Sequence, residues 1–336
     1  MGEKASRSYL KLEYNKSSDT EVITDDCKSW SFTDNASGKA DTMSLTLADN
    51  DQRWLHNYYP EANDKIKAWI ETEAWFTGGK PGELYLGAFL IDNFDTSGFP
   101  HNCEIEGISI PVNKDFSVTE KNKTWKSTTL QEIAKSIAGT AGVGLVYEAG
   151  SFSVTEESQS NQTDEAFLFS LCSARGLCMK LYNDKIVIYD MAKYEAQAAR
   201  YSFDQKDCED YRVHTAIMAH YDAVQMQYTS GKKAKTYTYN FTVPGTAGAR
   251  KLIVSGKADS VADAEQKAKA ALREKIRQEH TMSITVQGNT EYMAADCCNI
   301  TGFGKIDGKY FVDSVTHAKS GKYTCSLELH KVVTTF

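Results

Sequence analysis

The sequence lacks long apolar runs and is poor in proline. It has only 5 prolines in 336 residues, and no stretch reaches the ~18 consecutive apolar residues that a membrane helix needs. Residues 1–9 (MGEKASRSY) carry no hydrophobic segment behind Lys4 and Arg7. We therefore predict no membrane insertion and no signal peptide. A hydrophobic content of 41% is too high for a disordered chain, and one domain per ~150 residues predicts two or three domains.

An excess of positive charge is also missing. The 38 Lys and Arg residues face 45 Asp and Glu residues, which gives a net charge of −7. Proteins that bind nucleic acid or anionic membranes in general need clustered cations, so the composition argues against both classes, although a local basic patch stays open. Eighteen tyrosines with few prolines favour antiparallel sheet.

The eight cysteines form no C-x-x-C motif and no zinc-ligand spacing. Without a signal peptide the compartment should be reducing, so we predict buried free thiols and no metal site. The cysteines are Cys27, Cys103, Cys172, Cys178, Cys208, Cys297, Cys298 and Cys325.

Known catalytic motifs are absent: the sequence has no G-x-S-x-G, no H-E-x-x-H, no Walker A loop and no kinase-type set. We interpret Gly139–Gly144 as a helix stop and Gly302–Lys305 as a hairpin turn, because neither precedes a helix N-terminus. His214 and His220 would share a side of a strand but have no third ligand nearby. Asp92 and Asp95, around Phe94, could serve as the carboxylate pair of a glycosidase, but with 45 acidic residues such pairs arise by chance. The sequence thus predicts no catalytic, cofactor-binding or metal-binding residue.

Apolar residues alternate with polar ones through the first ~115 residues, as in Leu10–Tyr14, Met43–Leu47 and Cys103–Pro111. Closely spaced strands with Gly and Asn/Asp turns favour a barrel or a sandwich. The period then becomes helical from Thr129, which with Glu132 forms a capping box, to a stop at Gly139.

A second helix follows the polar linker Glu156–Thr163 and is capped by Thr163, and a hairpin turns at Asn183-Asp184. Together these segments predict a small α+β unit. Strands return from Val213, and Ser260 opens a long helix over residues 260–279, with four strands after it. Its cations (Lys267, Lys269, Arg273, Lys275 and Arg277) predict either a solvated face or a docking face for a partner.

Three stretches together resemble the baseplate hub family of contractile tails, which includes phage late control protein D, T-even-like tail hubs and the hub part of type VI secretion VgrG spikes. They are WKSTTLQEIAKSIAGTAGVGLVY (residues 125–147), QSNQTDEAFLFSLCSARGLCMKLYNDKIVIY (residues 159–189) and the helix-to-hairpin segment 262–317. The order and combination of the three carry the resemblance, since none of them is a catalytic motif.

The resemblance implies a mainly β fold in which two antiparallel tail-tube-like β-barrel domains flank a small α+β middle domain. The barrels would be residues 1–116 and 206–336, the second with the long helix, and the middle domain residues 117–205. It further implies a homotrimeric, non-enzymatic adaptor that joins the hexameric tail tube to the central spike, lines the channel and binds other baseplate proteins.

DNA or an effector would pass transiently through a lumen whose acidity repels DNA. We expect the spike, or the tail lysozyme or peptidase, to be a separate chain, because the sequence ends directly after its last strand. The expected location is the baseplate of a virion or phage-tail-like particle assembled in the bacterial cytoplasm.

Two alternatives remain. A carbohydrate or cell-wall-binding β protein could use Trp54, Tyr58 and Tyr59 as an exposed aromatic face, and a peptidoglycan hydrolase of the tail would need a carboxylate or nucleophile essential for turnover.

Overall fold

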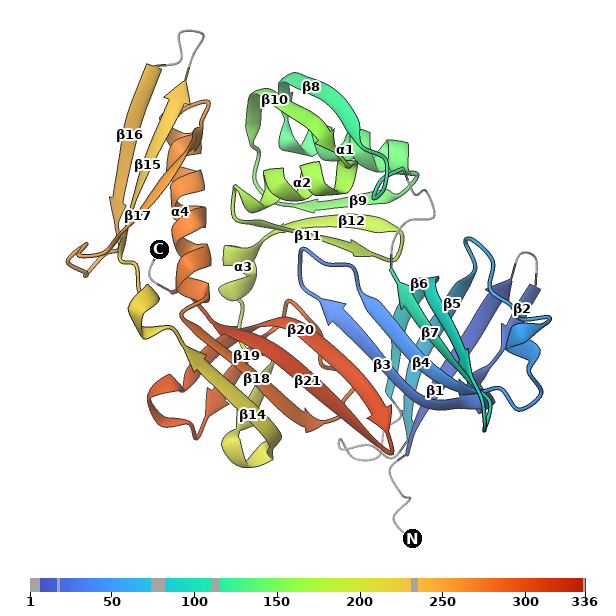
Figure 1. Cartoon of the computed structure of the whole chain (residues 1–336). Helices are drawn as coiled ribbons and strands as arrows, with labels where there is room; N and C mark the ends of the chain where they lie inside the picture. The colour runs from blue at the N-terminus through green and yellow to red at the C-terminus, as the bar shows by residue number, and fades with distance from the viewer. Residues whose placement is uncertain (1–6, 17–18, 74–81, 110–114, 231–234, 335) are drawn as a thin grey trace.

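The computed structural model describes residues 7–16, 19–73, 82–109, 115–230, 235–334 and 336. Figure 1 shows one large sheet along the base, with two smaller units standing side by side above it. One is an α+β middle unit, and the other is an arm made of a long helix and three strands.

The large sheet contains thirteen strands within the described residues. Their order follows the chain only in part, because β20 near the C-terminus pairs antiparallel with β3 near the N-terminus. The path is β14 (Cys208–Thr215), β18 (His280–Gln287), β21 (Lys322–Lys331), β20 (Gly308–Ser320), β3 (Cys27–Asn35), β4 (Thr42–Ala48), β7 (Asn102–Ile108), β6 (Gly82–Ser97), β5 (Lys65–Glu73), β1 (Arg7–Lys16) and β2 (Asp19–Val22), with β13 (Tyr201–Asp204) and β19 (Cys297–Thr301) attached beside β20.

The predicted class, mainly β with an α+β insert, is confirmed. The expectation of two closed barrels is corrected: in the described part of the chain the strands form one sheet whose path does not close on itself. β20 of the C-terminal half pairs with β3 of the N-terminal half. Each half therefore covers an open strand edge of the other, and neither half closes on itself. Both halves share one core, since Leu45 and Leu327, each fully buried, belong to the same cluster.

The middle unit packs α1 (Leu130–Ala141) and α2 (Asp164–Ser173) on small sheets. Thr129 and Glu132 form the predicted capping box, and Thr163 caps α2. The helix stop lies at Gly142, with φ 72°, and not at Gly139, which is helical. Its strands are β8 (Lys121–Thr129), β9 (Gly144–Glu148), β10 (Ser153–Gln162), β11 (Leu177–Tyr182) and β12 (Lys185–Asp190), followed by the short α3 (Met191–Glu195).

The predicted linker Glu156–Thr163 is wrong. Most of it lies in β10, which pairs antiparallel with β8 and leaves polar side chains on an exposed face. The hairpin at Asn183-Asp184 is confirmed, and both residues have the positive φ, 47° and 55°, of a type I′ turn.

The arm consists of α4 (Val261–Arg277) and the strands β15 (Ala223–Ser230), β16 (Lys235–Thr242) and β17 (Lys251–Lys257). Ser260 caps α4 as predicted. Ala264 and Ala268 are fully buried where the helix meets Val224 and Met226, because alanine lets helix and sheet approach closely. The parallel pairing of β17 with β15 is not visible in the sequence pattern.

No helix among the described residues is long and apolar enough to cross a membrane. All eight cysteines are free thiols in the structure; six of them are buried, as predicted, and Cys27 and Cys208 are half-buried.

Candidate functional site

One face of the large sheet is polar over the five adjacent strands β18, β21, β20, β3 and β4. Because side chains alternate across a strand, the residues between the core positions all point to the opposite face. On five adjacent strands most of them are serine or threonine and are only partly covered. They are Ser283 and Thr285 on β18, Thr324 and Ser326 on β21, Ser314 and Thr316 on β20, Ser29, Ser31 and Thr33 on β3, and Thr42, Ser44 and Thr46 on β4.

Hydroxyl groups bridge the strands of this polar face. Thr33 and Thr316, which are 283 residues apart in sequence, bring their Oγ1 atoms to 2.9 Å. Thr285 Oγ1 and Ser326 Oγ lie 3.0 Å apart. The polar face therefore runs unbroken across the β20–β3 joint, with small side chains that satisfy one another's hydrogen bonds.

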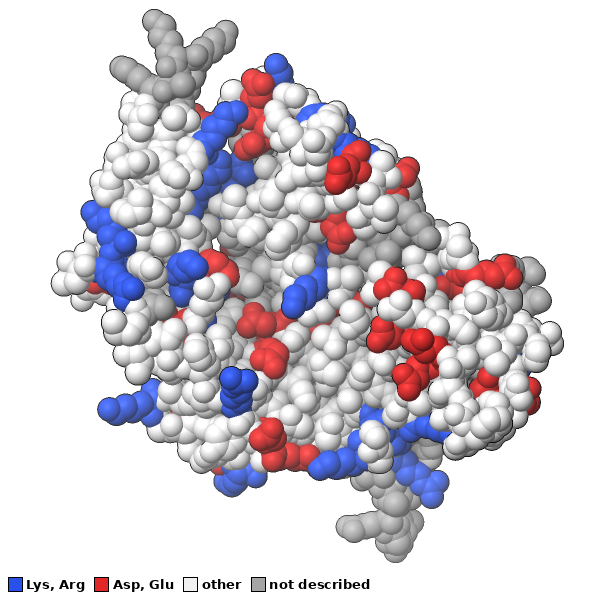
Figure 2. All heavy atoms as spheres, in the orientation of Figure 1, with Lys and Arg blue, Asp and Glu red and all other residues white. Residues whose placement is uncertain are grey.

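The polar face becomes acidic at its β7–β6 end. Glu104 and Glu106 on β7 lie opposite Asp95 and Asn93 on β6, and Asn93 donates a hydrogen bond of 2.9 Å to Glu106. Within the described residues, these three carboxylates have no ion-pair partner. Figure 2 shows a largely uncharged surface over β21, β20 and β3, with acidic side chains gathered over β4 and β7 on the right.

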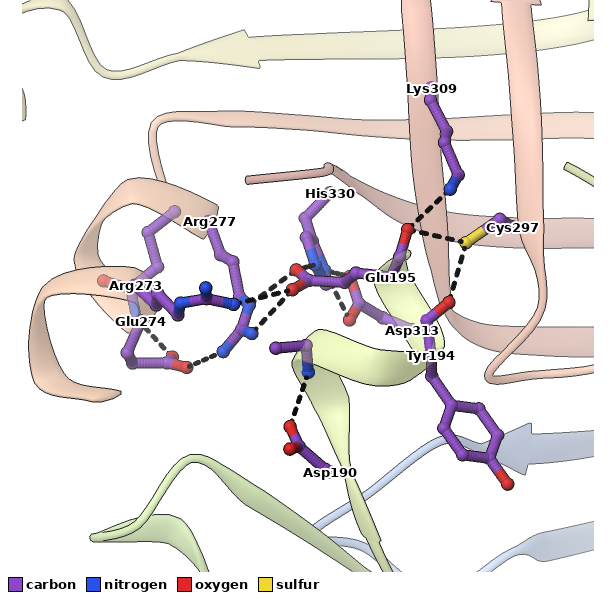
Figure 3. A network of polar contacts seen from close by, with 12 residues as sticks. Asp190, Tyr194, Glu195, Arg273, Glu274, Arg277, Cys297, Lys309, Asp313 and His330 are labelled. Atoms are coloured by element: carbon purple, nitrogen blue, oxygen red, sulfur yellow. Dashed lines mark hydrogen bonds and ion pairs between the residues drawn. The ribbon is translucent and has the colours of Figure 1, made fainter. Parts of the chain in front are cut away.

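A buried ion network fixes α3 and the base of α4 on the upper margin of the polar face (Figure 3). Glu195, with 1% of its side chain exposed, accepts hydrogen bonds from Arg277 Nε at 2.8 Å and Nη2 at 2.9 Å. His330 Nε2 lies 3.0 Å from Glu195 Oε1, and His330 Nδ1 lies 2.8 Å from Asp313 Oδ1. The network thus joins the middle unit, the arm and strands β20 and β21.

The charges of the network shift one another's pKa values. Burial raises the pKa of Glu195, but the hydrogen bonds from Arg277 and His330 outweigh burial and lower it to about 2. Burial also lowers the pKa of His330, but the carboxylates of Asp313 and Glu195 outweigh it and raise that pKa to about 9. Both groups are therefore charged at neutral pH.

We expect stability to fall in alkali because of His330. Its folded pKa of about 9 lies above its ordinary value of 6.5, so its contribution is complete below pH 6.5 and is lost as the pH rises through 9. The loss amounts to up to about 3 kcal/mol of the free energy of unfolding. Urea unfolding from pH 6 to pH 10 measures it, with His330→Gln as the comparison. A wild type and a variant that lose stability in parallel over this range would contradict the assignment.

A second polar contact holds the middle unit on the sheet. The β3–β4 turn enters this unit, where Gly38 N donates to Met179 O at 3.1 Å and Tyr189 Oη donates to Ala36 O at 2.7 Å. Lys180 on β11, with a 13% exposed side chain, reaches back to the carboxylates of Asp34 and Asp41.

The charged face of α4 is less solvated than one interpretation predicted. Two i, i+4 ion pairs form on this face, with Lys267 Nζ 2.8 Å from Asp263 and Lys269 Nζ 2.7 Å from Glu265. Arg277, however, is 7% exposed and pairs with Glu195. The C-terminal end of this face docks within its own chain, on α3.

Sequence reasoning missed a buried Cys–His contact. Cys325 Sγ lies 3.2 Å from His317 Nδ1, and Tyr323 Oη lies 2.7 Å from the same nitrogen. Burial raises the thiol pKa to about 12 and lowers the histidine pKa to about 4, the opposite of an activated thiolate. Neither side chain is more than 1% exposed, so this contact belongs to the core. The i, i+8 spacing across a hairpin is the only signal in the sequence.

The structure does not bring together the residues of the alternative hypotheses. Trp54 is fully buried and Tyr58 is half-buried, so of the three aromatic residues only Tyr59 is exposed. Asp92 and Asp95 are exposed beside Phe94, which packs on Tyr59.

His214 and His220 do not share a side of a strand, so that expectation is wrong. His214 is exposed on β14, but the strand ends at Thr215, and His220 instead lies 3.0 Å from Glu279 Oε2. The two side chains therefore share no strand face. No group of three or more His, Cys, Asp or Glu residues in the described ranges is placed to hold a metal ion.

No protein-family model and no curated protein sequence matches the chain. Solved structures do match it. A tail protein from Neisseria meningitidis is 13% identical, with a TM-score of 0.71 over 96% of this chain and 97% of that one. The 43 kDa tail protein of prophage MuSo2 from Shewanella oneidensis is 11% identical, with a TM-score of 0.73 over 97% and 98%.

A type VI secretion system component from E. coli is 10% identical, with a TM-score of 0.53 over 92% of this chain and 74% of that one. It is described as structurally similar to the T4 bacteriophage tail proteins gp27 and gp5. At these identities the likeness shows the fold. The resemblance to tail hub proteins predicted from residues 125–147, 159–189 and 262–317 is confirmed at that level.

Proposed function

We infer that this chain, which has the fold of phage tail proteins, is a structural hub adaptor of a contractile tail or tail-like injection particle. Three copies form a ring that continues the hexameric tail tube on one side and holds the spike on the other. The parts of the large sheet that lie within residues 1–116 and 206–336 then take the six positions of the ring, and residues 117–205, apart from β13, form an insert outside it. The role is non-enzymatic, and the spike or tail lysozyme is a separate chain.

The polar face is the observation that supports this proposal. A channel that passes DNA or an unfolded effector needs a wall without exposed apolar groups, which would bind the effector, and without clustered cations, which would bind DNA. The polar face offers small hydroxyls bonded to one another, and carboxylates at its β7–β6 end. We propose that it lines the lumen and that its acidity keeps DNA from binding.

Co-expression of this chain with the tube and spike proteins encoded beside it, followed by electron microscopy, tests the assembly. We expect three-fold rings located between tube and spike. Particles that assemble without this chain, or that carry it on the outside of the baseplate, would contradict the proposal.

A bulky side chain on the polar face tests the lining. The double variant Thr42→Trp, Ser44→Trp would place six indole rings in the lumen of a three-copy ring. We expect the ring to assemble but the delivery of DNA or effector by the particle to fall. Thr124→Trp, on an exposed position of β8 in the middle unit, is the matched control. Delivery that is unchanged in the polar-face variant would exclude this face from the channel.

A further inference from the structure

A cleft of about 750 Å³ lies between the arm and the middle unit. The arm lines it with β17 and α4, and the middle unit lines it with the end of α2 and the start of β11. Figure 2 shows it as a hollow between the two units. At the arm tip, where β17 leads into α4, Thr155 N donates to Asp259 Oδ2 at 2.7 Å. At the arm base Arg277 pairs with Glu195, so the two units are joined at both ends of the cleft.

Small side chains from both units line this cleft. They include Ser170, Ser173 and Ala174 of the middle unit and Ser255, Gly256 and Ala271 of the arm. Small residues leave space in which another backbone can approach closely. The part of α4 that lines the cleft, from Lys267 to Arg277, rises about 15 Å, the length of about four to five residues of an extended strand. The cleft thus has the dimensions of a short extended peptide.

β17 presents an open strand edge to the cleft. Among the described strands it pairs only with β15, in parallel. The backbone groups of Arg250 and Ala258 bond to the β15 side. Since alternate residues of a parallel strand turn their N–H and C=O groups to opposite sides, those of Ile253 and Ser255 point away from β15. Within the described ranges they meet no backbone partner there, and such an edge is a template for another strand.

The end of the cleft at the arm tip presents cations. Lys257, Lys267 and Arg175 line it, and among the described residues Glu157 is the acidic side chain that lines this end. Lys257 is exposed, and its Nζ lies 3.4 Å from a backbone oxygen, that of Glu156. Arg175 has 1% of its side chain exposed, yet in the described part of the chain its Nε and Nη2 atoms form no hydrogen bond.

The other carboxylates near the arm tip are already occupied. Asp263 lies 2.8 Å from Lys267 Nζ and 3.7 Å from Arg175 Nη2, so two cations share it. Asp259 accepts the hydrogen bond from Thr155 N. An acidic group that entered this end of the cleft would therefore find Lys257 available as a partner.

The end of the cleft at the arm base is acidic. Glu274 on α4 and Asp313 on β20 line it, with 59% and 40% of their side chains exposed. Arg277 also lines this end, but it is 7% exposed and bonded to Glu195. The accessible charge here is negative, so the cleft complements a segment with an acidic residue at one end and a basic residue at the other.

We propose that the cleft binds an extended segment of another protein, which adds as a strand to the free edge of β17, with an acidic residue beside Lys257 and a basic residue beside Glu274. Main-chain hydrogen bonds to Ile253 and Ser255 give the affinity, and the charged ends give the direction of the segment. The inference goes beyond the hub role, because it assigns a binding site that the ring and the channel do not require.

An extended segment is the occupant that these observations favour. A helix, with a diameter of about 10 Å including its side chains, would leave the strand edge without hydrogen bonds. A folded surface would reach the rim of the cleft but not the edge of β17. An extended segment fills the length of the cleft and pairs with that edge at the same time.

Fluorescence anisotropy with the full-length chain tests the site. The probes are two labelled peptides, Asp-Val-Thr-Val-Thr-Val-Lys and its reversed sequence, which cover both directions of an added strand. Versions that are N-methylated along the backbone cannot donate main-chain hydrogen bonds. Ser255→Pro removes the edge N–H, and Ser255→Val, which keeps it, is the matched control. Ala271→Trp fills the cleft, and Ala262→Trp, exposed in the first turn of α4, is its control. Circular dichroism melts verify that every variant is folded.

We expect saturable binding of one probe peptide, with affinity at least about tenfold lower in Ser255→Pro and Ala271→Trp and unchanged in the two controls. The N-methylated peptides should not bind. Lys257→Glu should weaken binding, and a peptide whose aspartate is replaced by lysine should restore it, because the charges are then complementary again.

Three results would overturn the proposal. They are the absence of saturable binding by either peptide up to about 1 mM, N-methylated peptides that bind as tightly as the others, and wild-type affinity in both Ser255→Pro and Ala271→Trp. Each of them would leave the hub proposal intact, because that proposal does not require the cleft.

Discussion

Arg277→Met is expected to lower the free energy of unfolding by about 3–5 kcal/mol, because it leaves a buried carboxylate without its main partner. Glu195 receives two hydrogen bonds from Arg277, at 2.8 and 2.9 Å, in a place where 1% of its side chain is exposed. Two weaker partners would remain: His330 Nε2 lies 3.0 Å from Glu195 Oε1, and Arg273 Nη1 lies 3.9 Å from Glu195 Oε2. Guanidinium chloride unfolding at pH 7 measures the loss.

Lys269→Met on the same helix is the matched control. Lys269 pairs with Glu265 at 2.7 Å, but both side chains are more than a third exposed, so its loss should cost about 0.3–0.5 kcal/mol. A Glu195→Met, Arg277→Met double variant should regain most of the stability, since a buried ion pair can be replaced by apolar side chains at little cost. Equal losses for Arg277→Met and Lys269→Met would show that the network does not hold the arm.

Lys180→Met is expected to have a comparable effect, about 3–5 kcal/mol at pH 8, by leaving two carboxylates face to face. Lys180 Nζ contacts the Asp34 carboxylate and lies 3.3 Å from Asp41 Oδ2. Burial raises the pKa of Asp41 to about 7, and Lys180 opposes that rise. Without the lysine the pKa of Asp41 rises further, so the defect should be smaller at pH 5, where the carboxyl group takes up a proton. Denaturant unfolding of the variant and the wild type at pH 5 and at pH 8 gives the loss of unfolding free energy at each pH.

Lys185→Met, at an exposed position of the neighbouring β12, controls for the loss of one positive charge. Adding Asp41→Asn to Lys180→Met should restore stability at pH 8, because one of the two facing charges is gone. Limited proteolysis should cut the middle unit faster in Lys180→Met alone. A defect of the same size at pH 5 and pH 8 would mean that packing, and not charge, is what Lys180 contributes.

These two contacts define how the units sit on the sheet. The Glu195 network holds α3 and α4 at the upper margin of the polar face, and Lys180 holds the middle unit on the β3–β4 turn. Between them and the acidic β7–β6 end, the serine and threonine rows are only partly covered. Loss of either contact should therefore disturb the proposed channel wall before it disturbs the core.

The sequence by itself determined the local elements. The Thr129–Glu132 capping box, the Ser260 cap of α4 and the Asn183-Asp184 turn were all predictable, because each depends on residues within a few positions of one another. Period-two alternation in Met43–Leu47 identified the strand and its buried side for the same reason. The tail-hub fold itself was predicted from the resemblance of residues 125–147, 159–189 and 262–317, taken in order, to the hub family.

Only the tertiary structure decided what those elements meet. The join of β20 to β3, the parallel β17, the strand within Glu156–Thr163 and the Glu195–Arg277 pair all link segments distant in sequence. A sequence does not show whether water or another residue forms the hydrogen bonds of a charged or polar side chain. For this reason a solvated Arg277 and a linker at Glu156–Thr163 were both consistent with the sequence. Strand register and buried charge depend on which distant segments come together, and so the polar face, as a continuous surface, is a property of the fold alone.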